Sequence, residues 1–156
     1  MVEFVRKRLR IDSFDYSQGD YVYFATLCAR HHTDPFADPR LAQGVIDALN
    51  WSRTQGRWKL YCYCLMPDHL HVATSPNGGH NLSATVGTFK SWTSRKAWEI
   101  GVHGQLWQHG WYDHVARREE DLVRICEYIL ANPVRGQLVS EPTAWPYSGM
   151  PDPLPL

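Results

Sequence analysis

The sequence lacks several features that would each assign it to a class of protein. No run approaches the ~20 apolar residues that a membrane-spanning helix needs, and no apolar stretch follows the charged start, as a signal peptide would require. The four cysteines are too few and too scattered for a disulfide scaffold, so we expect a reducing cytoplasm. There is no Gly-x-x-x-x-Gly-Lys phosphate loop and no internal repeat.

An excess of charge of one sign is missing as well, because sixteen Lys and Arg residues balance sixteen Asp and Glu residues. This balance provides no global argument for nucleic-acid binding, which is typical of basic domains. Twelve of the sixteen basic residues are arginines, however, and arginine suits forked contacts to phosphate. Residues 5–10 hold four basic side chains that form either a solvated arm or a phosphate-binding one: Arg6, Lys7, Arg8 and Arg10.

Hydrophobic patterns predict an alternation of strands and helices. The expected strands are 21–28, 58–66, 69–75 and 111–116, and the expected helices are 38–56, 82–100 and 118–133. Asp38 can cap the first helix, and Pro67-Asp68 can turn the central hairpin. Too few βαβ units are present for a doubly wound parallel sheet, so we expect an α+β fold with an antiparallel sheet that carries helices.

The chain length suits one domain, which we place at residues 1–140. Residues 141–156 contain five prolines and are expected to form a tail of extended, poorly ordered chain.

Two histidines, His69 and His71, stand one residue apart directly after the hairpin turn. Residues i and i+2 of a strand project from the same face, so both imidazoles point the same way. Such a pair can clamp a divalent metal, or it can remain partly exposed without a ligand.

Cys62 and Cys64 could complete a tetrahedral zinc site with the two histidines. The hairpin register decides this alternative. If Met66 pairs with His69, all four side chains share a face, whereas pairing of Leu65 with His69 turns the cysteines away. The sequence leaves both registers open.

The last expected helix carries a tyrosine beside its core face. Tyr128 lies about 110° from the centre of the apolar stripe, at roughly 100° per residue, and Asn132 stands one turn further along nearly the same face. Asn132 is also near the C-terminal end of the helix, where a cation is favoured. A metal held by the two histidines and Asn132, with Tyr128 one turn away, would be a chemically coherent site. The stripe itself consists of Leu122, Ile125, Cys126 and Ile129.

The stretches "MPDHLH" and "EYILANPVRGQLV" together resemble the single-strand DNA transposases and nucleases that have a His-hydrophobic-His motif and one catalytic tyrosine. Within that superfamily the chain is most similar to the REP-associated tyrosine transposases of bacteria, which are relatives of the transposase of insertion sequence 200. Further agreement comes from "DYSQGDYVYFAT", "GQLWQHGWYDHVARREEDLVRICEYI" and "AWPYS", so the resemblance covers nearly the whole chain.

The resemblance implies a ferredoxin-like sheet, with the two-histidine motif on a central strand and the catalytic tyrosine on the last helix. Matched residue by residue, His69 and His71 take the metal-ligand positions, Asn132 completes the metal site, and Tyr128 takes the position of the nucleophile. The implied cofactor is a divalent metal, Mg²⁺ or Mn²⁺. The chain departs from many relatives at Leu130, where they have a histidine.

The implied activity is cleavage and joining of single-stranded DNA through a 5′-phosphotyrosine, with REP-type hairpins as the target. A free tyrosine has a pKa of about 10, so at neutral pH it is mostly protonated and a poor nucleophile. Tyr128 therefore needs a base that accepts its proton, and the candidates are water and His114. We expect a cytoplasmic, nucleoid-associated bacterial protein, either a monomer or a homodimer, that binds single-stranded or hairpin DNA and no membrane.

Besides the N-terminal arm, phosphate contacts are expected from a basic face of the second helix, and bases could stack on exposed aromatic residues. The basic face comprises Lys90, Arg95 and Lys96, and the aromatic candidates are Trp107, Trp111 and Tyr112. Two other functions compete: a hairpin-binding protein without cleavage activity, and a zinc-site protein unrelated to DNA.

Overall fold

The computed structural model describes residues 21–116 and 119–155, which form an α+β fold around a five-stranded antiparallel sheet. The strands are β1 (Val22–Cys28), β2 (Trp58–Leu65), β3 (His69–Pro76), β4 (Tyr112–Ala116) and β5 (Ser148–Gly149), in the order β4-β1-β3-β2-β5. The helices are α1 (Pro39–Thr54), α2 (Leu82–Glu99), α3 (Glu119–Leu130) and α4 (Asn132–Arg135), with short 3-10 turns at Arg30–His32, Pro35–Ala37 and Pro142–Ala144. The chain order β1-α1-β2-β3-α2-β4 is that of a ferredoxin-like unit, so the expected fold class is confirmed.

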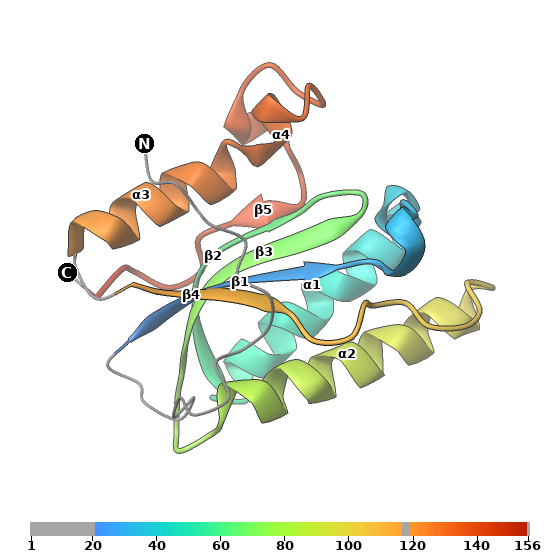
Figure 1. The fold of residues 1–156 in the computed structure, drawn as a ribbon, viewed down its shortest axis with the longest axis horizontal. Helices are drawn as coiled ribbons and strands as arrows, with labels where there is room; N and C mark the ends of the chain where they lie inside the picture. The colour runs from blue at the N-terminus through green and yellow to red at the C-terminus, as the bar shows by residue number, and fades with distance from the viewer. Residues whose placement is uncertain (1–20, 117–118, 156) are drawn as a thin grey trace.

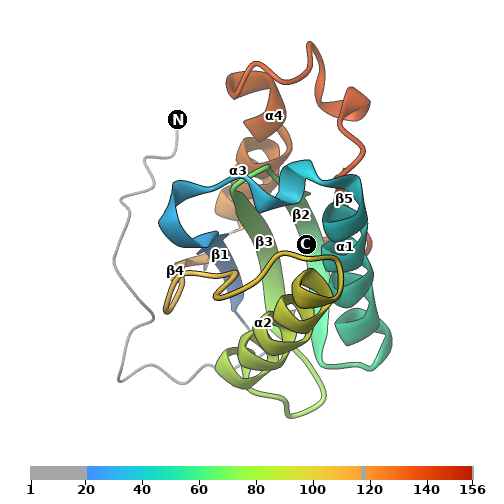
Figure 2. The ribbon, with the colours of Figure 1, turned by 90° about the vertical axis from the view of Figure 1, so that its right-hand side faces the viewer.

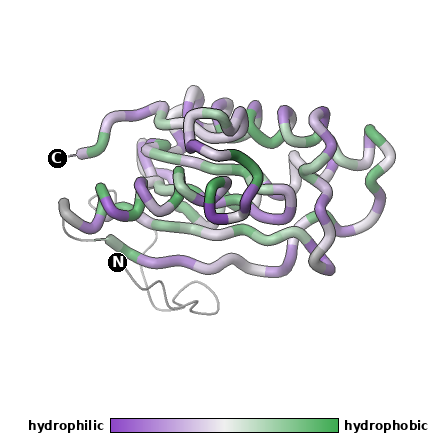
Figure 3. The backbone as a smooth tube through the Cα atoms, turned by 90° about the horizontal axis from the view of Figure 1, so that it is seen from above, coloured by the Kyte–Doolittle hydropathy of each residue, from purple (hydrophilic) through white to green (hydrophobic). Residues whose placement is uncertain are grey.

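Helices cover both faces of the sheet. α1 and α2 lie on one face, and α3 and α4 lie on the other (Figures 1 and 2). Each face has its own apolar cluster, one centred on α1 and α2 and one on α3. Hydrophilic and hydrophobic segments alternate along the helical coils, as expected for helices that bury one side (Figure 3). No helix in the described ranges is both long and apolar enough to cross a membrane.

The first helix begins and ends where its sequence signals predict. The side chain of Asp38 accepts a hydrogen bond from the amide of Arg40, and Pro39 is the first helical residue. Gly56 follows the helix with a φ of 72°, a conformation that favours glycine.

The hairpin register resolves the alternative that the sequence left open. The amide of Met66 donates to the carbonyl of His69 at 2.8 Å, and Cys64 pairs with His71. Directly opposed residues share a face of the sheet. Cys62 and Cys64 therefore lie on the same face as the two histidines, the face that α3 covers.

The last long helix buries the stripe that its sequence predicts, with Ile125 and Ile129 fully buried. α3 ends at Leu130, earlier than expected, and the chain continues as the short helix α4 with Pro133 in its first turn. Asn132 therefore lies at the junction of the two helices.

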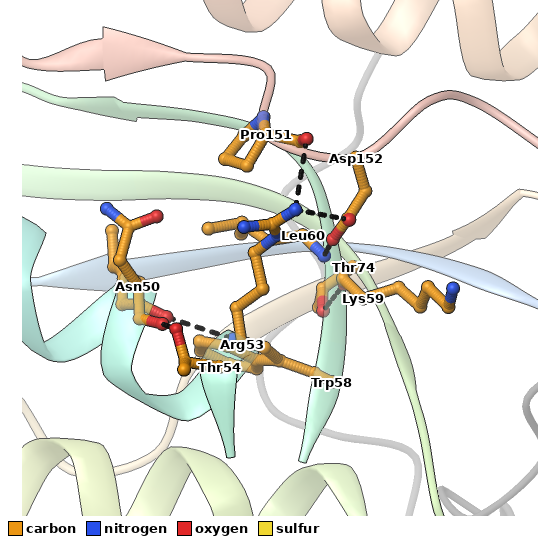
Figure 4. Close-up of polar contacts among 10 residues, drawn as sticks. Asn50, Arg53, Thr54, Trp58, Lys59, Leu60, Thr74, Pro151 and Asp152 are labelled. Atoms are coloured by element: carbon orange, nitrogen blue, oxygen red, sulfur yellow. Dashed lines mark hydrogen bonds and ion pairs between the residues drawn. The ribbon is translucent and has the colours of Figure 1, made fainter. Parts of the chain in front are cut away.

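The expectation of a poorly ordered tail is wrong for the segment that ends at Asp152. β5 pairs with β2, and the carboxylate of Asp152 accepts hydrogen bonds from the amide of Leu60 (2.8 Å) and from Arg53 (2.9 Å; Figure 4). Trp145 Nε1 also donates to the carbonyl of Leu65 at 3.0 Å. The tail is ordered because it supplies partners to backbone groups along the β2 edge, which would otherwise lack them.

Candidate active site

The two histidines project from β3, the middle strand of the sheet, toward α3 and α4. Their ring centroids are 4.6 Å apart and the rings are nearly perpendicular. His71 is only 8% exposed, whereas His69 is half-buried. The pair therefore lies at a boundary between core and solvent.

His69 is held by its neighbours on both ring nitrogens. Its Nδ1 lies 2.6 Å from Oδ1 of Asp68, and its Nε2 lies 3.0 Å from Nδ2 of Asn132. An ionised carboxylate only accepts hydrogen bonds, so Nδ1 carries the proton and Nε2 presents a lone pair toward Asn132. The α3–α4 junction and the sheet thus meet at this imidazole.

His71 is oriented by residues of the neighbouring strand β1. Thr26, its direct partner in the β1–β3 register, places its Oγ1 2.8 Å from Nδ1 of His71. The ring of Phe24 stacks on the imidazole with centroids 5.3 Å apart. These contacts restrict both the position and the rotation of the ring.

Tyr128 reaches this site from α3. Its ring centroid is 6.2 Å from that of His71 and 6.1 Å from that of Phe24, with the rings in edge-to-face geometry. The guanidinium of Arg135 lies 3.9 Å above the tyrosine ring and donates to the Tyr128 carbonyl at 2.8 Å. A cation at that distance stabilises negative charge on the ring system.

His69, His71 and Asn132 offer a plausible donor set for a divalent cation. Ligands about 2.1 Å from an octahedral ion lie about 3.0 Å apart, the separation found between His69 and the Asn132 amide. The nitrogen and oxygen of an amide are nearly equivalent in shape, so Asn132 can present its oxygen when a cation is there. Within the described ranges, no three His, Cys, Asp or Glu side chains form a metal-binding group, so a metal held by these two histidines would need a further ligand such as Asn132.

The cysteines do not form the alternative zinc site in the described part of the chain. Cys62 and Cys64 are fully buried against α3, and Cys62 directs its thiol to the Cys126 carbonyl. Burial raises the pKa of Cys64 to about 12, and contact with Cys126 together with burial raises that of Cys62. Both cysteines are packed as core residues of the cluster under α3.

Those residues predicted to bind DNA that the structure describes are not gathered at this site. The arm residues Arg6, Lys7, Arg8 and Arg10 lie outside the described residues. Lys90, Arg95 and Lys96 belong to α2, on the opposite face of the sheet (Figure 1). Lys90 donates to the carbonyls of Gln108 (3.1 Å) and Gly110, and burial lowers its pKa to about 8. Its ammonium group therefore anchors a loop.

Two of the three aromatic stacking candidates are wrong, because Trp107 and Trp111 are buried. Trp107 packs against Phe36 and Phe89 and donates its indole N–H to Thr93 at 2.9 Å. Tyr112 alone is partly exposed.

The sequence analysis missed three residues of the site. Asp68 was interpreted only as a turn residue, although its position beside His69 was a usable signal. Arg135 stands seven residues after Tyr128, so helical periodicity could have placed it on the same side. Thr26 carries no local signal, since only the β1–β3 register brings it to His71.

A ferredoxin-like sheet with two histidines on its middle strand and a tyrosine on a flanking helix has the architecture expected of single-strand DNA transposases. The chain belongs to the IS200-like transposase family, whose model matches residues 21–132. That range includes His69, His71, Tyr128 and Asn132.

Two proteins assigned to the REP-associated tyrosine transposases are similar in sequence. The Haemophilus influenzae protein is 28% identical over 152 residues, covering 86% of this chain and 81% of its own length. The Escherichia coli protein is 26% identical over 94 residues, covering 58% of this chain and 53% of its own.

Solved structures show the same fold. A REP-associated tyrosine transposase bound to a REP hairpin superposes with a TM-score of 0.68 at 21% identity, covering 95% of this chain and 82% of that one. A Deinococcus radiodurans protein described as a transposase matches with a TM-score of 0.53 at 20% identity, covering 77% of this chain and 94% of that one.

Proposed function

We propose that this protein cleaves and rejoins single-stranded DNA by transesterification, with Tyr128 as the nucleophile. The observation that carries the proposal is the meeting of Tyr128 with the two-histidine pair, at 6.2 Å between the rings of Tyr128 and His71. The proposed substrate is a REP-type DNA hairpin with single-stranded flanks. The hairpin in the structurally similar transposase supports this choice.

In the proposed reaction, the phenol oxygen of Tyr128 attacks the phosphorus of a phosphodiester. A 5′-phosphotyrosine bond forms, the bond to the 3′ oxygen breaks, and the strand leaves as a 3′-hydroxyl that takes up a proton. One phosphoester replaces another, so no nucleotide hydrolysis is needed. A different 3′-hydroxyl then attacks the phosphorus of the phosphotyrosine. The new phosphodiester joins two strands, the bond to the Tyr128 oxygen breaks, and the released phenolate takes up the proton of that hydroxyl.

Two basic side chains could support the nucleophile. Arg135, above the ring of Tyr128, would stabilise the developing phenolate. His114 pairs with Phe24 in the β1–β4 register and so lies on the face of the sheet that Tyr128 contacts. We propose His114 or a water molecule as the proton acceptor.

The proposed metal would be held by His69 and His71, each through Nε2, and by the amide oxygen of Asn132. When bound, a divalent cation would polarise the scissile phosphate and neutralise charge on its oxygens. Mg²⁺ prefers oxygen ligands, so two imidazoles favour Mn²⁺ of the two ions. Asp68 would keep the His69 ring in the tautomer that presents Nε2, and Thr26 would hold the His71 ring in position through Nδ1.

The test is a panel of hairpin oligonucleotides with single-stranded flanks, incubated with Mn²⁺ or Mg²⁺ and scored for a protein–DNA band that resists denaturation. We expect the band with the wild-type protein and none with Tyr128→Phe. Tyr147→Phe, which alters another half-buried tyrosine packed on the opposite apolar cluster, is the matched control.

Two results would contradict the proposal. A band that persists in Tyr128→Phe would assign the nucleophile to another residue. Hairpin binding by the wild-type protein without any covalent band would favour the competing function, a hairpin-binding protein that does not cleave. The resemblance implies a histidine in many relatives at the position of Leu130, which here packs against the α3 cluster, and the lack of that imidazole favours this second function.

A further inference from the structure

Three clefts follow one another from the β4 edge of the sheet across α2 to α1. The β1–β4 cleft has a volume of about 310 Å³ and lies between the end of β1 and residues 108–112. The α2–loop cleft, of about 700 Å³, separates α2 from residues 104–109, and the α1–α2 cleft, of about 280 Å³, lies between the two helices. Gln108 and His109 line both the first and the second cleft, and Arg95 lines both the second and the third. Neighbouring clefts therefore adjoin one another through these shared residues, and we call the three clefts together the path.

The path begins at the candidate active site. Thr26 lines the β1–β4 cleft, and its hydroxyl is the group that contacts His71. Cys28 lines the same cleft and pairs with His69 in the β1–β3 register. The β1–β4 cleft is therefore next to the β1 residues that pair with the two histidines.

The loop that separates the clefts is held in place at several points. The amide of Gln108 donates to the Cys28 carbonyl at 2.8 Å, and the amide of Arg30 donates to the Leu106 carbonyl at 2.9 Å. From the other side, Lys90 of α2 donates to the carbonyls of Gln108 and Gly110. The path thus has a fixed wall, which suits a binding groove that exists before the ligand arrives.

The outer part of the path combines exposed tryptophans with cations. Trp98, Trp92 and Trp51 are 47%, 39% and 50% exposed. Lys96 Nζ lies 5.0 Å above the ring of Trp92, and the Arg57 guanidinium lies 4.8 Å above that of Trp51. Among the described residues, no aspartate or glutamate lines the first two clefts, and Asp47 lines the third. Aromatic platforms interleaved with cations are typical of surfaces that bind single-stranded nucleic acid.

We infer that this path binds the single-stranded arm of the DNA substrate, leading it from the active site over Gln108 and His109 and along α2. Bases stack on Trp98 and Trp92, and Arg95 contacts phosphates between them. The inference rests on the proposed function, since it assumes that DNA occupies the site beside His69 and His71. A second copy of this chain is the other occupant that the test considers, but an interface core is normally depleted of charge, whereas Lys96 lies over the ring of Trp92 and Arg57 over that of Trp51.

The test measures the affinity of the full-length protein for a hairpin with and without a single-stranded arm of about ten nucleotides, a span that one single-strand groove can cover. The arm is placed on the 5′ side in one series and on the 3′ side in another. We expect one arm to tighten binding, and Trp98→Ala to weaken binding of that armed hairpin roughly 5- to 100-fold. Binding of the hairpin without an arm should be unchanged.

Matched variants separate stacking from structural effects. Trp98 also donates its indole N–H to the Gly104 carbonyl at 2.7 Å, a bond that Trp98→Phe removes while keeping an aromatic ring. Retained affinity in Trp98→Phe supports stacking, and equal loss in both variants overturns it. For the armed hairpin, the logarithm of the binding constant should fall linearly with the logarithm of the salt concentration. Arg95→Ala should reduce the magnitude of this slope by about 0.7, the amount expected for one phosphate contact to single-stranded DNA. Lys59→Ala, an exposed cation of β2 that lines none of the clefts, should not lower it.

The failures of the two proposals are distinguishable. If the wild-type protein forms the covalent adduct but gains no affinity from either arm, the path is wrong and the proposed function stands. If no oligonucleotide binds at all, the proposed function fails first. A concentration-dependent dimer that Trp98→Ala disrupts would assign the surface to a second copy of the chain and overturn the inference.

Discussion

The contact between Thr26 and His71 allows a sharp test of the candidate metal site. Thr26 Oγ1 lies 2.8 Å from Nδ1 of His71, across the β1–β3 pairing. Thr26→Val keeps the shape and the β-branching of the side chain but removes the hydroxyl. The substitution therefore removes the group that orients the imidazole without removing the proposed ligand.

The expected magnitude follows from the role of such a hydrogen bond. Loss of a partner that orients a metal-binding histidine typically lowers metal affinity 10- to 100-fold, or about 1.4–2.7 kcal/mol. The cost to folding should be smaller, about 1 kcal/mol, because a single hydrogen bond contributes little net stability. Metal affinity should therefore fall by more than fold stability does.

The assay is titration with Mn²⁺, followed by calorimetry or by the electron paramagnetic resonance signal of free Mn²⁺. Thr54→Val is the matched control, because it removes an exposed threonine hydroxyl that bonds to the Asn50 carbonyl on α1. One result would refute the assignment of His71 as a metal ligand oriented through Nδ1. It is a Thr26→Val protein that has the melting temperature of the wild type and binds Mn²⁺ with unchanged affinity.

Two further predictions concern the elements that position the site. Ile129→Ala, at a fully buried position of α3, should lower the free energy of unfolding by about 3 kcal/mol. The control Val123→Ala, at an exposed position of the same helix, should change it by less than about 0.5 kcal/mol. Urea denaturation measures both values, and equal effects would contradict the packing of α3 on the sheet. Burial raises the pKa of Asp152, but hydrogen bonds from Arg53 and the Leu60 amide lower it further, so that it lies below the usual 3.8. The ionised carboxylate therefore adds to the free energy of unfolding above the unfolded-state pKa of 3.8. This added stability is lost as the pH falls through the lower folded-state pKa. Asp152→Asn should remove this acid-dependent part of stability, and a variant with the wild-type pH profile would show that the tail docks by other contacts.

The sequence predicted the elements well, because their signals are local. The Asp38 cap, Pro39 and Gly56 delimit α1 within a few residues, and periodicity identified both the core stripe of α3 and the position of Tyr128 beside it. The expectation that Asn132 lies near the histidines also rests on helical spacing, and its amide is 3.0 Å from His69.

Features that depend on pairing between distant segments could not be predicted in the same way. The hairpin register that puts Cys64 opposite His71 is decided by packing on both faces of the sheet. The proline-rich tail was misjudged because its order comes from the β2 edge and Arg53, not from its own composition. Thr26 reaches the site only through strand pairing.

The most direct test of the central claim is to map the DNA-linked peptide by mass spectrometry after incubation with a flanked hairpin and Mn²⁺. The account predicts a nucleotide phosphate on the peptide that contains Tyr128, and loss of the adduct when His69 or His71 is replaced by alanine in a folded protein. An adduct on any other residue, or one that forms undiminished without both histidines, would contradict it.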